Sequence, residues 1–356
     1  MPHNLYAQTE GAAFVMRDLK VVNIKDISRS FTEIDRPRPL SLLKNSLNSK
    51  LSVRQCNHAH AFIAEVENVH VIGTGSLVQD DKLIVHGLSS GNYAAHLAIQ
   101  LRNYDSMPEG GQIDDECVLL WGNSNFGHWI VTYLLRLTLL WYQSGLREKP
   151  LLISKSVPKR FLDWLQRMDL RHYRFVEDGV KVRRLWVPSV VAYRGHYNDS
   201  GIYVMPEAVN ILRHLLIWDL ELPRFPRTRL YLSRDKAKIR RLTNESEFSK
   251  ALEAKGIQRV FMEELPLDNQ LDLISRAELI VIHAGGGSPI TMFAPRDCKI
   301  IELSLPRFEG IFVSHLWAYI LGQSIGRIDA RPVTQTGPLG IDWDGEIDIN
   351  EVKALI

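Results

Sequence analysis

The chain of 356 residues has little cysteine and no large excess of either charge. Its three cysteines, Cys56, Cys117 and Cys298, lie far apart and match no zinc-site or disulfide spacing, which favours a reduced compartment. The 43 Lys and Arg residues nearly balance the 41 Asp and Glu residues, giving a formal net charge of +2. This balance argues against a dedicated nucleic-acid surface.

Long hydrophobic runs are also missing. No apolar stretch reaches the roughly 18 residues that a membrane-spanning helix needs, and residues 1–11 lack the charged and apolar regions of a signal peptide. We therefore expect a cytoplasmic protein, with peripheral membrane association left open. A composition of 45% hydrophobic and 24% charged residues is typical of a globular chain, and its length suffices for about two domains.

The most informative stretch is an apolar segment that runs into three glycines. Residues 279–282 predict a strand buried on both faces, and the chain continues through His283 to Gly285, Gly286 and Gly287. Glycines let a ligand approach the backbone closely, and the amides of a helix that follows them favour an anion such as a diphosphate. A tight turn without a ligand is the alternative, and the glycines alone do not decide between the two.

Two neighbouring strands bring charged residues to the same edge. Residues 299–303 predict a strand that carries Glu302, and residues 229–234 predict one that ends at Arg234. Open parallel sheets bind ligands at the carboxyl ends of their strands. Arg234 could clamp a phosphate there, because a planar guanidinium donates two parallel hydrogen bonds.

A second candidate site lies in the N-terminal half. Residues 117–121 predict a buried strand, followed by a polar segment and an apolar helix over 130–142. Asn125 and His128 then lie at the first turn of that helix, where ligands bind. Since the unperturbed pKa of histidine is about 6.5, His128 is a candidate base. The alternative is that both residues only satisfy the helix end.

Strands and helices alternate on both sides of a proline-containing segment at 222–226, which predicts two α/β domains. The expected boundaries are 1–222, with antiparallel strands of a half-exposed sheet at about 61–86, and 223–339 for a Rossmann-like domain. Residues 340–356 predict a C-terminal tail helix that ends near the first domain. The basic cluster between Arg171 and Arg184 is interpreted as a solvated strand face.

Many short motifs together resemble glycosyltransferase family 61, in particular bacterial members of the capsular-polysaccharide type. In the C-terminal half these are Tyr231-Leu232-Ser233-Arg234, Arg240-Arg241, Asn244-Glu245, Gly256, Glu263-Glu264-Leu265, Gln270, Ala277, the loop from His283, Phe293-Ala294-Pro295 and Ile301-Glu302-Leu303. Upstream, Asn125-Phe126-Gly127-His128-Trp129 and the apolar helix after it strengthen the resemblance.

The resemblance implies a GT-B architecture, in which two Rossmann-like domains face a cleft. It implies an inverting transfer of a sugar from a nucleotide-sugar donor to a saccharide or glycan acceptor, without metal or cofactor. Carried over to this chain, Arg234, Arg240, His283, the glycine loop and Glu302 bind the donor, with Glu302 on the ribose. Asn125 and His128 belong to the acceptor side, with His128 as the base; Glu116 and His196 are the spare candidates.

The chain departs from the family pattern at two places. Thr132 stands where members commonly carry an acidic residue, one helical turn after His128. The loop reads His-Ala-Gly-Gly-Gly, shifted by one residue against the family's His-Gly-Ala-Gly. The competing hypothesis is therefore a GT-B module that has lost catalysis and serves as a binding or assembly partner. The sugar, the base, the acceptor and the oligomeric state do not follow from the sequence.

Overall fold

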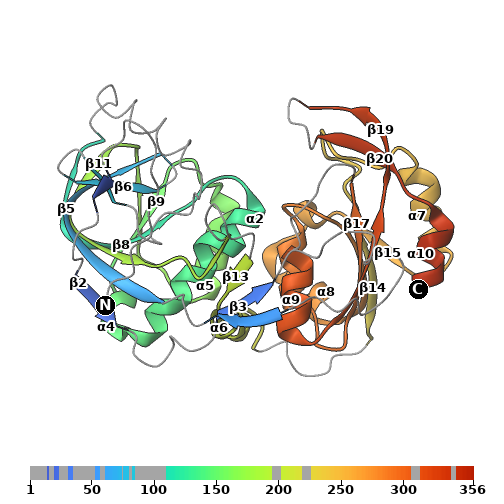
Figure 1. Ribbon diagram of the computed structural model, residues 1–356, viewed down its shortest axis with the longest axis horizontal. Coiled ribbons are helices and arrows are strands. Elements are labelled where there is room, and N and C mark those ends of the chain that lie inside the picture. The colour runs from blue at the N-terminus through green and yellow to red at the C-terminus, as the bar shows by residue number, and fades with distance from the viewer. Residues whose placement is uncertain are drawn as a thin grey trace. The chain divides into compact units, whose positions relative to one another are not determined.

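The fold is that of a computed structural model (Figure 1). The structure describes residues 14–15, 20–23, 31–34, 53–56, 61–73, 75–79, 82–84, 110–194, 202–218, 226–305, 313–337 and 342–356. Within these ranges, no helix combines the length and the apolar character needed to cross a membrane. The expected linker at 222–226 falls largely outside the described residues, and so does His196.

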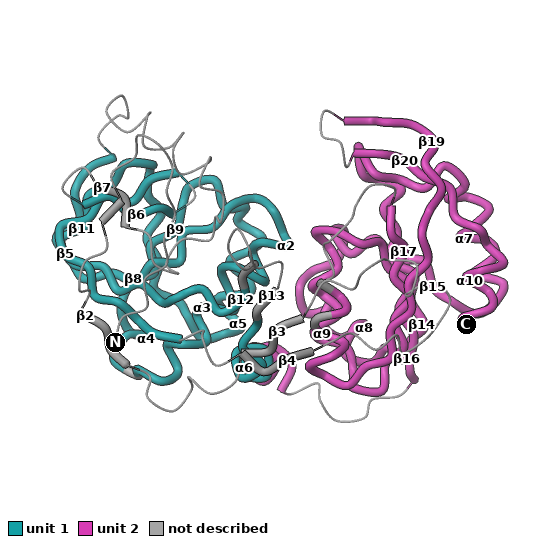
Figure 2. The backbone as a smooth tube through the Cα atoms, in the orientation of Figure 1, with its two compact units in different colours: residues 1–33, 54–212 teal, residues 34–53, 213–356 magenta. Residues whose placement is uncertain are grey.

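The chain divides into two compact units (Figure 2). Unit 1 comprises residues 1–33 and 54–212, and unit 2 comprises residues 34–53 and 213–356. The division falls within helix α6, Pro206–Ile217, about ten residues before the proline-containing segment. Both units contain parallel strands and helices, so the mixed α/β class expected from the alternating pattern is confirmed.

Unit 1 is built on a nine-stranded mixed sheet in the order β1-β7-β6-β5-β11-β8-β9-β10, with β2 also paired to β5. Its strands β11, β8, β9 and β10 are parallel, whereas β5, β6 and β7 are antiparallel, and β5 joins the two parts by pairing antiparallel with β11. The strands are β1 (Phe14–Val15), β2 (Lys20–Asn23), β5 (Phe62–Ile72), β6 (Ser76–Gln79), β7 (Lys82–Ile84), β8 (Gln112–Trp121), β9 (Leu151–Ser154), β10 (Tyr173–Val176) and β11 (Val180–Pro188). A smaller sheet has the order β12-β13-β3-β4, from β12 (Ala192–Arg194), β13 (Ile202–Val204), β3 (Phe31–Ile34) and β4 (Val53–Cys56).

The antiparallel strands at 61–86 exist, but the expectation of a half-exposed sheet is wrong. Most residues of β5 and β6 are buried, including Glu65. The Glu65 carboxylate lies 3.2 Å from Nε of Arg184 on β11, and this pairing is what makes burial of a charge tolerable. Glu65, although charged and part of an alternating pattern, therefore does not indicate a solvent-exposed face of the sheet.

The helix after β8 is not a regular α-helix. It starts as α2 (Phe126–His128), continues as a π-helix, η2 (Trp129–Leu134), then α3 (Leu135–Leu137), and ends as a 3₁₀ turn, η3 (Thr138–Tyr142). It begins four residues earlier than the apolar pattern predicts, because the polar residues of its first turn carry no hydrophobic periodicity. Among its described residues, unit 1 also contains α4 (Ser144–Arg147), η4 (Lys159–Phe161), α5 (Leu162–Arg167) and the first part of α6.

Unit 2 contains a five-stranded, fully parallel sheet in the order β15-β14-β16-β17-β18. The strands are β14 (Thr228–Leu232), β15 (Gln258–Val260), β16 (Ala277–His283), β17 (Lys299–Ser304) and β18 (Ser324–Asp329). Numbered along the chain the order is 2-1-3-4-5, a doubly wound topology whose direction reverses between β14 and β16. The expected Rossmann-like character of this part is thus confirmed.

Helices cover both faces of the unit 2 sheet (Figure 1). On one face α7 (Glu245–Glu253) and α10 (Ile349–Leu355) pack through Phe248, Leu252, Val352 and Leu355 onto a buried cluster that includes Tyr231. The other face is covered by α8 (Leu267–Ser275) and α9 (Val313–Leu321). The C-terminal helix therefore contributes to the core of unit 2. Its apolar residues Ile349, Val352 and Leu355 recur three positions apart and form the face that packs on this cluster.

A two-stranded antiparallel hairpin, β19 (Arg331–Gln335) and β20 (Trp343–Glu346), precedes α10. All five β19 residues are exposed. By contrast, Asp344 and Gly345 of β20 are buried. The hairpin therefore buries β20, not β19, against the rest of unit 2.

Candidate functional site

The candidate site in unit 2 lies where the sheet order reverses. The chain leaves β14 through Ser233 and Arg234, and it leaves β16 through the loop Ala284 to Gly287. β14 and β16 are parallel neighbours, and their carboxyl ends lie at the point where the strand order of the sheet reverses. This is the place at which doubly wound sheets bind ligands.

Two guanidinium groups converge on the glycine loop. A Cβ placed on Gly285 would lie 3.9 Å from Nη1 of Arg234 and 4.0 Å from Nη1 of Arg240. Gly285 itself has φ +144°, a conformation that side-chain-bearing residues rarely adopt. The backbone geometry therefore requires the glycine, and both guanidinium groups reach the space beside it.

The charge of Arg234 is not neutralised within this crevice. Among the described residues no carboxylate lies within ion-pair distance of it, and its guanidinium instead faces the carbonyl oxygens of Arg240 at 3.4 Å and Ile239 at 3.5 Å. Burial and the neighbouring Arg240 charge lower the pKa of Arg234. Two like charges held together in a partly buried place favour an anion between or beside them.

Arg240 has an unusual backbone. Its φ of +59° places it in the left-handed region, which costs a non-glycine residue on the order of 1–3 kcal/mol. On its other side, Nε of Arg240 lies 3.7 Å from the buried carboxylate of Asp342. The surrounding contacts must therefore hold the residue in place.

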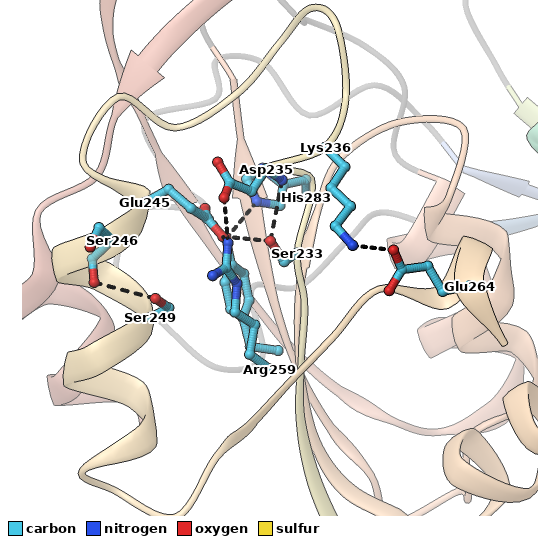
Figure 3. A network of polar contacts seen from close by, with 10 residues as sticks. Ser233, Asp235, Lys236, Glu245, Ser246, Ser249, Arg259, Glu264 and His283 are labelled. Carbon is cyan, nitrogen blue, oxygen red and sulfur yellow. Dashed lines mark hydrogen bonds and ion pairs between the residues drawn. The ribbon is translucent and has the colours of Figure 1, made fainter.

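A buried polar network supports the ends of β14 and β16 (Figure 3). Glu245, the first residue of α7, accepts hydrogen bonds at 2.5 Å from Tyr231 Oη and at 2.5 Å from Ser233 Oγ, and its carboxylate lies 3.0 Å from Arg259. Arg259 also lies 2.8 Å from Asp235. The network fixes the backbone on both sides of Arg234.

The network also fixes the proton on His283. Nε2 of His283 lies 3.0 Å from Tyr231 Oη, whose single hydrogen points to Glu245. His283 must therefore donate from Nε2, which leaves Nδ1 as an acceptor. Burial, with the Arg234 charge, lowers the pKa of His283 to about 3, so the ring is neutral. His283 is 2% exposed, and its contact with Tyr231 holds the ring in a fixed position at the end of β16.

The helix expected after the glycines is a short 3₁₀ helix, η7 (Ser288–Phe293). At its start Ser288 Oγ donates to Gly285 O at 2.7 Å, and Pro289 is tolerated in the first turn because the N–H that it lacks would have no partner within the helix. Arg213 and Gln323 donate to carbonyl oxygens at its end, at Met292, Ala294 and Pro295. The loop is thus held firmly, but it has no long helix to supply a strong dipole.

Glu302 lies on β17 with its side chain fully buried. Its Oε1 atom lies 3.5 Å from Nε2 of His315 on α9. Burial raises the pKa of Glu302, but His315 and the charge of Arg327 outweigh it and leave the pKa lowered. The expected ribose contact stays a prediction, and this burial counts against it because neither oxygen is open to solvent.

The structure brings the two unit 1 candidates, Asn125 and His128, together in one helical turn. Asn125 is the N-cap of α2, and its Oδ1 accepts from the backbone N–H of His128 at 3.2 Å. Asn125 therefore supports His128 through the main chain, as the helix-end alternative describes. The His128 ring contacts Thr132 Oγ1 through Nδ1 at 3.4 Å. His128 is solvent-exposed, yet partial desolvation of its ring lowers its pKa.

The turn that presents His128 is strained. Trp121, the last residue of β8, has φ +65° although its side chain is bulky and fully buried. Its indole N–H donates to Gly73 O at 2.7 Å, which locks the residue in place. Gly122 follows with φ +103°, and a Cβ there would meet Val157 at 2.7 Å. Backbone strain stored beside a helix start with an exposed histidine is typical of a functional turn.

One spare candidate base is unsuitable for proton abstraction. Glu116 pairs with Lys149 and, at 2.6 Å, with Arg184, and these contacts lower its pKa to about 2. Such a carboxylate has little affinity for a proton near neutral pH.

Three carboxylates at the unit 2 site were not predicted from the sequence: Glu245, Asp342 and Asp344. The motif Asn244-Glu245 carries the family resemblance, but it does not indicate that the Glu245 side chain turns inward to this network. Asp342 and Asp344 lie about a hundred residues from the arginines that they contact. Only the alternation of acidic residues with Trp343 in β20 hinted at a buried face there.

The comparisons with known proteins give one family. The model of glycosyltransferase 61 matches residues 126–301, which include His128 and the whole glycine loop. No curated protein matches the chain. The chain belongs to glycosyltransferase family 61.

Proposed function

We propose that the protein is an inverting glycosyltransferase that moves a sugar from a nucleotide-sugar donor to a saccharide acceptor. The family supports glycosyl transfer in general. The proposal adds a GT-B arrangement, with unit 2 as the donor side and unit 1 as the acceptor side, and a reaction without metal. A role in capsular polysaccharide synthesis stays a prediction.

The observation that carries the donor assignment is the pair of guanidinium groups at the glycine loop. Arg234 and Arg240 both approach Gly285, and Arg234 has no carboxylate partner among the described residues. A leaving diphosphate develops negative charge that must be stabilised, and guanidinium groups with nearby backbone amides are suited to this task. His283, neutral and fixed by Tyr231, closes the crevice without adding a further positive charge.

The acceptor side of the proposal rests on His128. Inversion needs one direct attack by an acceptor hydroxyl, and a positioned base that removes its proton contributes typically about 10²–10⁴-fold. The exposed ring on a capped, strained turn has the accessibility that a base needs. Thr132 can accept a hydrogen bond from Nδ1–H, which would leave Nε2 free to take the proton.

A screen of donor hydrolysis tests the proposal. The purified chain is incubated with a panel of nucleotide sugars, and release of the nucleoside diphosphate is measured with and without EDTA. We expect release from one donor class, unaffected by EDTA and lost on Arg234→Ala. An Arg331→Ala variant is the matched control, because Arg331 is an exposed arginine that pairs with Glu346 across its own hairpin. Release of the nucleoside diphosphate that requires a divalent metal would contradict the proposal that the reaction needs no metal.

A further inference from the structure

The hairpin β19–β20 contacts the loop from Arg240 to Thr243 at several points. Gly345 N–H donates to Arg241 O at 3.0 Å, and Thr243 N–H donates to Gly345 O at 2.8 Å. Leu242 forms a bridge to Gly345 in the parallel sense. The loop from Arg240 to Thr243 is therefore paired to the hairpin along its backbone.

Two buried carboxylates of this hairpin region hold consecutive arginines. Asp344 accepts from the backbone N–H of Arg241 at 2.8 Å and from its side chain at 3.1 Å and 3.3 Å. Asp342 lies 3.7 Å from Nε of Arg240, with its side chain only 3% exposed. Asp344 thus fixes the main chain directly after Arg240, and Asp342 faces the inner edge of its guanidinium.

This arrangement accounts for the strained backbone of Arg240. The φ of +59° is held from one side by Arg234, whose Nε donates to Arg240 O at 3.4 Å, and from the other side by Asp344. With Nε directed to Asp342, Nη1 remains directed to Gly285, 4.0 Å from the position of a Cβ there. Tight packing keeps Asp342 in place, because a Cβ on Gly337 would lie 2.5 Å from its Oδ2.

We propose that Asp342 and Asp344 of the β19–β20 region are positioning residues of the donor site that aim Arg240 at the donor diphosphate. The inference rests on the proposed function. It extends the site beyond residue 301, where the family match ends, to residues that the match does not include.

Titration with inorganic pyrophosphate tests the inference, because this probe needs no particular base or sugar. Calorimetry on the full chain compares the wild type with Asp344→Ala, Asp342→Asn and Arg240→Ala. Glu346→Gln is the matched control, since Glu346 is an acid of the same hairpin that pairs with the exposed Arg331. Removing a carboxylate near an anion site would by itself tighten anion binding. Weaker binding therefore reports a lost position rather than a lost charge.

We expect Asp344→Ala and Asp342→Asn to raise the Kd of pyrophosphate about tenfold, with Glu346→Gln within about twofold of the wild type. In the Arg240→Ala background the Asp344→Ala change should have no further effect, because its target is gone. If Asp344→Ala does not fold, the nearly isosteric Asp342→Asn variant still tests the inference.

Three results would overturn the inference. They are unchanged or tighter binding in both aspartate variants, an equal loss in the Arg240→Ala background, or a loss of the same size in Glu346→Gln. The wild-type titration distinguishes failure of the proposed donor site from failure of this inference. If the wild type does not bind pyrophosphate, both are wrong. If it binds and neither aspartate substitution changes the Kd, only the inference is wrong.

Discussion

Thr132 Oγ1 lies 3.4 Å from Nδ1 of His128, one helical turn away. The hydroxyl thus occupies the place in which family members commonly carry a carboxylate, and it still contacts the ring. A hydroxyl can accept from Nδ1–H and so orient the imidazole, but it brings no negative charge to stabilise the imidazolium. Thr132 can therefore orient His128 without raising the pKa of the ring.

The pH dependence of turnover should report this relationship. His128 acts as a base only when neutral, and desolvation lowers its pKa, so we expect the acid limb of the rate profile to have its inflection below about 6.5. Thr132→Asp should move that inflection up by on the order of one pH unit, because the carboxylate favours the charged ring. Thr132→Asn, which adds no charge, is the control. Identical profiles for Asp and Asn would show that the ring does not control the rate.

Removal of the imidazole should affect chemistry more than binding. We expect His128→Ala to lower kcat by about 10²-fold or more with little change in KM, because a base acts in the transition state. Asn125→Ala should give a smaller loss, since Asn125 caps the helix through the backbone of His128. Steady-state kinetics on folded variants decide the matter, and a His128→Ala enzyme with full turnover would exclude the histidine as base.

His283 should make the protein less stable in acid. Its folded pKa is lowered to about 3, whereas the unfolded chain binds the proton near 6.5. The free energy of unfolding therefore carries its full contribution above pH 6.5 and loses it as the pH falls toward 3. Between pH 7 and pH 5 we expect a loss of about 2 kcal/mol in urea unfolding that is absent in His283→Gln. Equal losses in both proteins would contradict the buried neutral ring.

Substitution of Glu302 distinguishes a structural role of its carboxylate from a contact with the donor ribose. Its carboxylate is fully buried beside His315, so Glu302→Gln should lower the free energy of unfolding by about 3 kcal/mol, as when one partner of a buried pair is removed. The preference for a ribonucleotide over its 2′-deoxy analogue should stay unchanged. A lost preference at wild-type stability would instead restore the ribose assignment.

The sequence predicted the parts of unit 2 that obey local rules. The apolar run of β16, the glycines and Arg234 at the end of β14 all appear where expected, because buried parallel strands are continuous hydrophobic runs. The 3₁₀ geometry of η7 did not follow, because it depends on how Arg213 and Gln323 hold its end. Tertiary contacts of this kind leave no periodic signal.

The polar partners of the site could not be predicted for a related reason. Asp344 contacts Arg241 across 103 positions, and Glu245 reaches Tyr231 through a side-chain direction that helix propensity does not determine. In unit 1 the π-helical turn after His128 was likewise invisible to a pattern based on 3.6 residues per turn. Local sequence thus indicated the two arginines beside the glycine loop and missed the carboxylates that contact Arg240 and Arg241.

Binding of a nucleoside diphosphate to the wild type and to Arg234→Ala tests the central claim most directly. Calorimetry with UDP, GDP, CDP and ADP should show one preferred ligand whose affinity falls at least tenfold in Arg234→Ala, while Arg331→Ala binds as the wild type does. A ligand at a hundred times its Kd should also add about 2.7 kcal/mol to the free energy of unfolding. Binding that is equally strong without the Arg234 guanidinium, or no binding of any of the four ligands, would contradict a diphosphate site at the glycine loop.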